Sequence, residues 1–245
     1  MTTKVVPGML VAGENAAEVA TEAAGRMTRV LAKALGQKKR VAIALSGGST
    51  PRAAYGELAR AEGIDWSRVD VFFVDERAGD PESDRSNYRM IREALLGPAR
   101  IADENVARMP GDAGDLATAA RTYQTEIERR VAKKGDLPAF DLVVFGIGAD
   151  GHTASLFPGE GTVLIRDRLV VDVPARPGHE ARLSLAAPLL EHAENAVVIA
   201  VGKEKHGALE RAWAVRGDLD ETPARLIRAV QGSIVWVIDR AAGAG

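Results

Sequence analysis

The sequence of 245 residues contains no cysteine and only four histidines, at positions 152, 179, 192 and 206. The absence of cysteine excludes disulfide scaffolds, thiol nucleophiles, cysteine-ligated zinc and iron–sulfur clusters, and it is compatible with a reducing cytosol. None of the histidines belongs to a His-x-His or His-Glu-x-x-His pair, the patterns that begin many transition-metal sites. We therefore expect chemistry that uses neither a metal ion nor a cofactor.

The sequence also lacks an excess of charge of one sign and any long apolar run. Its 32 Lys and Arg residues nearly balance its 34 Asp and Glu residues, so no overall field attracts nucleic acid or an anionic membrane. The longest apolar runs, such as residues 197–201, are far shorter than the roughly 18–20 residues of a transmembrane helix. The start, MTTKVVPGML, lacks the pattern of a signal peptide. We expect a cytoplasmic protein that binds neither nucleic acid nor membranes.

What is present is the composition of a globular protein, with 46% hydrophobic and 27% charged residues, and we expect one domain over residues 1–245. Short apolar runs alternate with segments of helical periodicity. The expected strands are residues 41–45, 69–74, 141–145, 169–173, 197–201 and 234–238. The expected helices are residues 14–35, 51–60, 86–96, 116–131, 204–215 and 222–230. This alternation predicts an α/β fold of three layers, a mainly parallel sheet with helices on both faces, and a frayed tail at 241–245.

Parallel sheets bind ligands at the carboxyl ends of their strands, which directs attention first to the loop at residues 46–51, Ser-Gly-Gly-Ser-Thr-Pro. Gly47 and Gly48 let backbone amides approach a ligand closely, and the hydroxyls of Ser49 and Thr50 can donate hydrogen bonds. A helix that follows directs its positive end to the same point, which suits a phosphate. The same residues also fit a purely structural interpretation, in which Thr50 caps the helix and Pro51 is its first residue.

The second loop carries three successive charges, Asp75, Glu76 and Arg77, directly after a buried strand. Taken alone, these charges are more typical of a solvated cluster of ion pairs than of a functional site. Their place at the carboxyl end of a strand shifts the balance toward a site. Further on, Asn87 offers both a donor and an acceptor to a substrate hydroxyl, and it is equally suited to capping the helix that begins nearby.

The third loop, residues 146–159, begins with Gly-Ile-Gly-Ala-Asp-Gly, which matches the dinucleotide-binding pattern Gly-x-Gly-x-x-Gly after a strand. That pattern requires a long helix after the third glycine, whereas Phe-Pro-Gly at 157–159 breaks the chain within two turns. We therefore interpret Asp150 and Gly151 as a tight turn that presents His152. A histidine held in this way is a candidate general base, with Asp75 or Asp150 as the carboxylate that orients it.

In combination these motifs resemble the 6-phosphogluconolactonases. The resemblance is carried by Leu-Ser-Gly-Gly-Ser-Thr-Pro at 45–51, Asp-Glu-Arg at 75–77, Ser-Asn-Tyr at 86–88 and the fourteen residues 146–159. It extends through Arg-Leu-Ser-Leu at 182–185 and Gly-Lys-Glu-Lys at 202–205, so it covers nearly the whole chain. One departure is Ala186, where the family commonly has a threonine. The resemblance implies a sugar-phosphate isomerase-like fold.

The glucosamine-6-phosphate deaminases share that fold and provide the main alternative, an isomerase or deaminase of an amino-sugar phosphate. They carry Asp-Glu-Tyr where this chain has Asp-Glu-Arg at 75–77, and Asn-Glu-Pro-Gly where it has Leu-Phe-Pro-Gly at 156–159. Phe157 thus replaces the glutamate that helps to open the sugar ring, and a phenyl ring cannot transfer a proton. A non-catalytic sugar-phosphate sensor is the other alternative, and it would not need His152.

The resemblance implies hydrolysis of 6-phospho-D-glucono-1,5-lactone, a step of the oxidative pentose phosphate pathway. Its phosphate would be held by Gly47, Gly48, Ser49, Thr50, Arg182 and Lys205, and a substrate hydroxyl by Asn87. The base would be His152, oriented by Asp75 or Asp150, and the oxyanion would be stabilised by Arg77 or by an amide of a glycine loop. Without the resemblance, Arg182 and Lys205 are better interpreted as ordinary surface charges.

Overall fold

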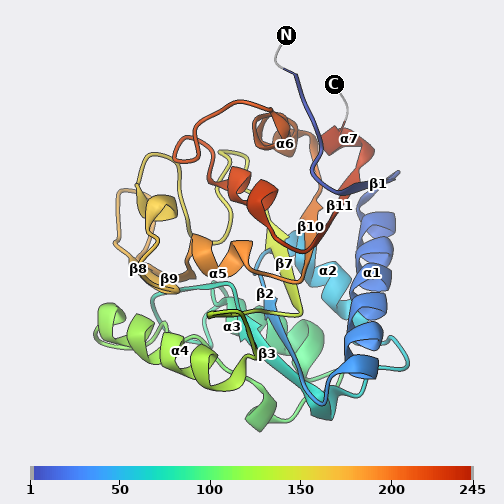
Figure 1. The fold of residues 1–245 in the computed structure, drawn as a ribbon, viewed down its shortest axis with the longest axis vertical. Helices are drawn as coiled ribbons and strands as arrows, with labels where there is room; N and C mark the ends of the chain where they lie inside the picture. The colour runs from blue at the N-terminus through green and yellow to red at the C-terminus, as the bar shows by residue number, and fades with distance from the viewer. Residues whose placement is uncertain (1–2, 244–245) are drawn as a thin grey trace.

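A six-stranded parallel sheet forms the centre of the computed structural model, which describes residues 3–243 (Figure 1). In spatial order its strands are β1 (Met9–Gly13), β11 (Ser233–Asp239), β10 (Asn195–Ala200), β7 (Leu142–Gly146), β2 (Val41–Leu45) and β3 (Val69–Phe73). All neighbouring strands are parallel. Every residue of β2 and β3 is buried, as expected where both faces of a sheet are covered. The predicted parallel sheet is confirmed.

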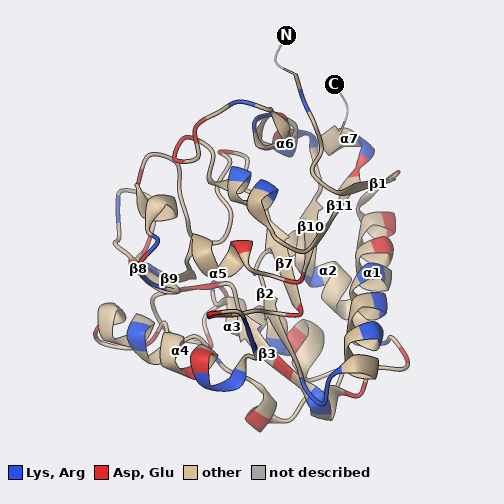
Figure 2. Ribbon diagram, in the orientation of Figure 1, with Lys and Arg blue, Asp and Glu red and all other residues tan. Residues whose placement is uncertain are grey.

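Helices cover both faces of this sheet, which confirms the predicted three layers. Figure 1 shows α1 (Ala16–Gln37) and α2 (Ser49–Leu58) on one side of the central strands and α5 (Ala187–Glu191) on the other. The indole of Trp213, in α6 (His206–Trp213), packs edge-on against Trp236 of β11. Acidic and basic residues are interspersed over the fold (Figure 2). Within residues 3–243, no helix is long and apolar enough to cross a membrane.

A second, antiparallel sheet lies beside the first and was not predicted as a separate sheet. It consists of β4 (Asp75–Arg77), β9 (Arg182–Leu185) and β8 (Val170–Val173). Helix α4 (Leu116–Arg130) packs against β8. Residues 75–77, predicted as a loop, are thus a strand, and the predicted strand at 169–173 belongs to this sheet. A two-stranded ladder, β5 (Lys133–Lys134) with β6 (Leu137–Pro138), completes the strands.

Several helices differ in extent from their predictions. The predicted helix at 86–96 is α3 (Asn87–Ile91) followed by a turn of π-helix (Arg92–Leu96). The predicted helix at 204–215 is a 3₁₀ turn (Lys203–Lys205) followed by α6, and that at 222–230 is a 3₁₀ helix (Pro223–Ala229). Strand β1 and helix α5 were not predicted. Met9 and Leu10 of β1 are 50% and 44% exposed, because β1 is an edge strand and lacks the fully buried pattern of its neighbours.

The expected fraying of the tail is wrong for residues 241–243. The chain forms a short helix α7 (Arg240–Gly243), in which Ala242 is fully buried. The amide of Ala242 donates to the Asp239 carboxylate at 2.9 Å, so Asp239 caps the turn. Residues 244 and 245 lie outside the described residues.

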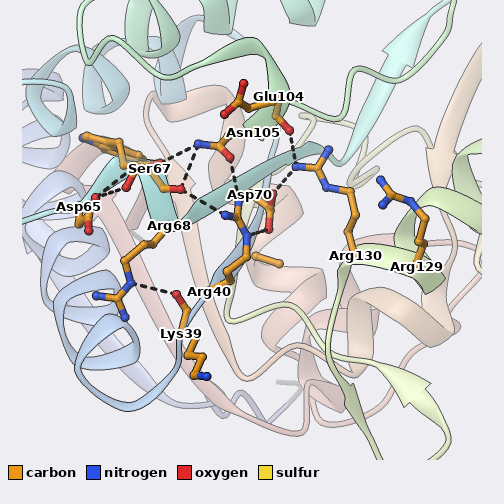
Figure 3. Close-up of polar contacts among 12 residues, drawn as sticks. Lys39, Arg40, Asp65, Ser67, Arg68, Asp70, Glu104, Asn105, Arg129 and Arg130 are labelled. Atoms are coloured by element: carbon orange, nitrogen blue, oxygen red, sulfur yellow. Dashed lines mark hydrogen bonds and ion pairs between the residues drawn. The ribbon is translucent and has the colours of Figure 1, made fainter.

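A charged clamp at the amino end of β3 joins that strand to α4 (Figure 3). Asp70 is 3% exposed and accepts two hydrogen bonds from Arg40, at 2.8 and 2.9 Å, and another from Arg130. Burial raises the pKa of Asp70, but the hydrogen bonds and charges of the two arginines outweigh it, and the net effect lowers the pKa. The clamp lies at the opposite end of β3 from the loops that the sequence singles out.

We expect Asp70→Asn to destabilise the protein by about 1–3 kcal/mol at pH 7, because two arginines lose their charged acceptor. A carboxyl whose pKa is lower in the folded than in the unfolded protein stabilises the folded state. This stabilisation is complete above the unfolded pKa of about 3.9 and is lost as the pH falls through the folded pKa. Urea unfolding from pH 7 to pH 3 should therefore show the difference from wild type narrowing below about pH 4. Asp84→Asn, whose side chain is 91% exposed, is the matched control and should change little. Equal stability of the two variants would contradict the role of the clamp.

Candidate active site

A pocket of about 200 Å³ lies at the carboxyl ends of β2, β7 and β10 and is closed from the side by β4 and β9. The structure brings ten of the eleven predicted site residues to its wall. They are Gly47, Gly48, Ser49, Thr50, Asp75, Arg77, Asn87, His152, Arg182 and Lys205. The eleventh, Asp150, contacts His152. The pocket thus collects residues from all three loops and from three further segments, at Asn87, Arg182 and Lys205.

The first loop leaves the start of α2 without a side-chain cap. Gly48 occupies the capping position with a φ of 112°, a conformation that glycine adopts without strain, and no side chain accepts from the first amides of the helix. The interpretation of Thr50 as the cap and Pro51 as the first residue is therefore wrong, because the helix begins at Ser49. The amides of Ser49 and Thr50 have no acceptor within the helix, since its first N–H groups precede its first turn. Within the described chain neither amide has a hydrogen-bond acceptor, so both are available as donors at the pocket wall.

Alternation along β4 separates the three charges of the second loop. Asp75 and Arg77 line the pocket, whereas Glu76 lies on the other face of the strand. The Glu76 carboxylate accepts from the amides of Arg77, Asn87 and Tyr88, each at 2.8 Å, and from the Ser86 hydroxyl at 3.0 Å. Burial raises the pKa of Glu76 despite these hydrogen bonds. The loop is therefore not a solvated cluster of ion pairs, and Glu76 joins β4 to the start of α3.

The side chain of Asn87 is almost fully buried and holds Arg77 in place. Its Oδ1 accepts from Arg77 Nη1 at 2.8 Å, and its Nδ2 donates to the main-chain oxygen of Asp75 at 2.8 Å. Helix α3 is capped by Ser86, whose hydroxyl accepts from the Arg89 amide at 3.2 Å, so the alternative that Asn87 is the cap is wrong. A Cβ at Gly47 would lie 1.7 Å from Asn87 Oδ1, so the first loop can pack here only with glycine.

The third loop forms the predicted tight turn and presents His152. Gly148 donates to the His152 main-chain oxygen at 2.9 Å, and Gly151 has a φ of 102°. Asp150 Oδ1 lies 2.7 Å from His152 Nδ1 and also accepts from the His152 amide at 3.1 Å. Of the two carboxylates that the sequence left open, Asp150 is the one bonded to the imidazole. Asp75 instead accepts from the Ser155 hydroxyl at 2.5 Å.

The contact between Asp150 and His152 indicates which nitrogen of the imidazole carries a proton. Partial burial works against ionisation of Asp150, but the hydrogen bond and charge of His152 lower the pKa of Asp150 to about 2. An ionised carboxylate only accepts, so Nδ1 of the imidazole carries the proton that it shares with Asp150. When the ring carries only that proton, Nε2 is an acceptor, and it is the nitrogen that can take a proton from a ligand or a water.

Two cations complete the pocket. Arg182 is the first residue of β9, and its Nη1 lies 3.4 Å from the Ser155 hydroxyl and 3.8 Å from Asp75. Burial lowers the pKa of Arg182, and its Nε has no partner among residues 3–243. Lys205 ends the 3₁₀ turn after β10 and makes no ion pair within the described chain. Two incompletely paired cations beside free helix amides form a site for a small anion.

Residues that the sequence analysis did not single out support this arrangement. Ser155 links Asp75 and Arg182, and Glu76 orders the start of α3. The sequence indicates these roles only in part. Ser155 lies within the fourteen-residue motif at 146–159, and side chains that alternate along a strand would place Glu76 on the face opposite Asp75 and Arg77. In the part of the chain that the structure describes, no group of three or more His, Asp or Glu residues is placed to hold a metal ion.

The fold and the pocket define a class of α/β proteins that have a charged pocket at the carboxyl edge of a parallel sheet, with a paired histidine and aspartate beside basic side chains. Within that class, the chain belongs to the family of glucosamine-6-phosphate isomerases/6-phosphogluconolactonase, whose profile matches residues 14–236. The resemblance found in the motifs is thus confirmed at the level of the family.

Relatives and solved structures agree with this membership. A 6-phosphogluconolactonase from Synechocystis sp. is 38% identical over 218 residues, 89% of each chain, and one from Nostoc sp. is 36% identical over 86% of this chain and 87% of its own. The solved 6-phosphogluconolactonase from Thermotoga maritima has a TM-score of 0.80 at 28% identity, over 95% of this chain and 99% of its own. The solved 6-phosphogluconolactonase from Trypanosoma cruzi has a TM-score of 0.85 at 25% identity, over 98% of this chain and 97% of its own.

We expect Gly148→Ala to displace the His152 ring, because a Cβ at Gly148 would lie 2.1 Å from His152 Nδ1 and 2.4 Å from Asp150 Oδ1. Overpacking of this kind costs about 1–3 kcal/mol, and the imidazole ¹⁵N signals of His152 should shift as well. Gly146→Ala is the matched control from the same loop, since a Cβ there meets nothing within 4 Å. Unchanged His152 signals in Gly148→Ala would show that the turn does not depend on this close approach.

Proposed function

We propose that this chain is an enzyme, a 6-phosphogluconolactonase, which hydrolyses 6-phospho-D-glucono-1,5-lactone to 6-phosphogluconate in the oxidative pentose phosphate pathway. The observation that carries the proposal is one pocket in which a His–Asp pair, His152 with Asp150, lies with two cations, Arg182 and Lys205. A base and an anion site in one pocket are what the hydrolysis of a phosphorylated ester requires. The names of the Synechocystis and Nostoc relatives support the same function.

In this proposal the substrate phosphate binds at the start of α2. The uncapped amides of Ser49 and Thr50 donate to its oxygens, together with the hydroxyls of both residues. Lys205 and Arg182 supply charge-assisted hydrogen bonds to the dianion. Binding the remote phosphate holds the lactone in place, so attack on its carbonyl becomes effectively unimolecular.

His152 then acts as the general base. Its Nε2 takes a proton from a water as the water oxygen forms a bond to C1, and Asp150 stabilises the imidazolium that results. As the tetrahedral intermediate collapses, the bond between C1 and the ring oxygen breaks and the ring oxygen takes the proton back from His152. Arg77 supports the oxyanion, since Asn87 orients its guanidinium and its Nε has no partner among residues 3–243.

The structure also bears on the deaminase alternative. Phe157, which replaces the glutamate of the deaminases, is 2% exposed and packs on the His152 ring with centroids 4.8 Å apart. A carboxylate at this position would have to lie among apolar and cationic groups. The aromatic side chain leaves His152 as the acid–base group, which favours hydrolysis over ring opening and isomerisation.

The proposal is tested by two parallel assays on the purified protein. We expect hydrolysis of 6-phospho-D-glucono-1,5-lactone above the spontaneous rate and no release of ammonia from glucosamine 6-phosphate. His152→Ala should lower kcat by about 10²–10⁴ without loss of folding, as is typical when a general base is removed. His192→Ala is the matched control, because that imidazole contacts the Lys134 main chain instead. Deamination without lactone hydrolysis would refute the proposed function, and full activity of His152→Ala would remove His152 from the mechanism.

The phosphate assignment makes a separate prediction. Lys205→Ala should raise KM about tenfold or more for the phosphorylated lactone, because a charge-assisted hydrogen bond is lost. It should have little effect on gluconolactone without the phosphate. Lys203→Ala removes the same charge from the same turn but not from the pocket wall, and it should leave both KM values unchanged. Equal effects of Lys205→Ala on the two lactones would contradict the phosphate site.

A further inference from the structure

The side chain of Phe157 lies at the centre of a cluster of two histidines and two arginines beside the pocket. The centroid of its ring is 4.8 Å from that of His152 and 5.0 Å from that of His179. The guanidinium carbons of Arg176 and Arg182 lie over the same ring, 4.6 and 5.2 Å from its centre. The face of a phenyl ring carries partial negative charge, so it attracts both cations while its apolar body packs on the imidazoles.

These four partners come from three segments of the chain. His152 belongs to the turn after β7, and Arg182 is the first residue of β9. Arg176 and His179 lie in the connection from β8 to β9 and are joined by two main-chain hydrogen bonds, at 2.9 and 2.8 Å. Arg176 also pairs with Glu160 at 2.5 Å, so the connection is tied to the segment that follows Phe157. The ring of Phe157 is therefore the common contact between the turn of His152 and the second sheet.

The known polar contacts of His152 and Arg182 do not by themselves set their positions. The imidazole is held at one atom, Nδ1, by Asp150. The hydrogen bond and the close approach of Gly148 both act at the Nδ1 side of the ring, so the far side with Nε2 is located by packing. Among residues 3–243, the polar contacts of the Arg182 guanidinium are those to Ser155 and Asp75, at 3.4 and 3.8 Å, which are long for a hydrogen bond and an ion pair. A rigid ring packed against both groups supplies the restraint that these contacts lack.

We propose that Phe157 is a positioning residue for both His152 and Arg182, which rests on the roles given to those two residues in the proposed function. Because one rigid side chain locates the base and a phosphate-binding cation together, it sets the distance between them. That distance must match the separation of the lactone carbonyl and the phosphate in the substrate. Phe157 thus contributes both to turnover and to the choice of a substrate with this separation.

Phe157→Leu tests the proposal, since leucine keeps the apolar character of the site and removes the ring. We expect kcat to fall and KM for the phosphorylated lactone to rise, each by about tenfold or more, since small misplacements of reacting groups have large effects on rate. In the His152→Ala background the same substitution should lower kcat no further, because the base that it positions is absent. Phe140→Leu is the matched control, since Phe140 is equally buried but packs on Phe72, away from the pocket.

A second readout does not depend on activity. The ¹⁵N signals of the His152 imidazole report its hydrogen bond to Asp150 and are little affected by the ring current of a neighbouring phenyl group. They should therefore move in Phe157→Leu and stay in place in Phe140→Leu. If wild type lacks lactonase activity, the proposed function fails, while the NMR comparison still decides whether Phe157 positions His152. Unchanged His152 signals in Phe157→Leu would overturn the proposal. A kcat lowered by the same factor in the wild-type and His152→Ala backgrounds would overturn it as well.

Discussion

The arrangement of the pocket depends on two main-chain hydrogen bonds at Val74. Its amide donates to the Leu45 oxygen at 3.0 Å, within the parallel sheet, and its own oxygen accepts from the Leu185 amide at 2.8 Å, within the antiparallel sheet. The chain therefore passes from one sheet to the other at a single residue. This passage carries Asp75 and Arg77 to the wall opposite the loop after β2, and it brings Arg182 to them through the pairing of β4 with β9. A pocket with charged groups on two sides follows from this change of sheet.

A second constraint is the close approach of main chain and functional side chains. Gly47 packs against Asn87, and Gly148 packs against the His152 ring, at distances that leave no room for a Cβ. Because glycine has no side chain, the Asn87 amide lies directly on the backbone of Gly47 and the His152 ring on that of Gly148. This contact limits each polar group to a narrow range of orientations. Gly47 and Gly148 therefore help to hold Arg77 and His152 through their neighbours Asn87 and Asp150.

Much of the fold and of the site can be predicted from the sequence, because buried parallel strands are apolar on both faces and their carboxyl ends meet at one edge. The strand β4 could not be found in this way, since its three residues are charged and its partner β9 lies more than a hundred residues further on. The sequence also leaves open whether Asp75 or Asp150 is the partner of His152, because both follow strands whose carboxyl ends meet at the same edge of the sheet. Only the three-dimensional structure distinguishes them. Asn87 was predicted as a substrate ligand, but whether its amide meets a ligand or Arg77 depends on packing that no local pattern encodes.

The uncapped start of α2 links ligand binding to the stability of the fold. Most helices of this length receive a side-chain acceptor at their first turn, and here Gly48 offers none. In the proposed complex, the substrate phosphate takes the place of that acceptor, so the ligand completes a helix that the protein alone leaves incomplete. A residue at position 48 with its own acceptor would satisfy the same amides permanently and would compete with the phosphate for them. The empty enzyme thus gives up part of the stability of one helix to keep its anion site open.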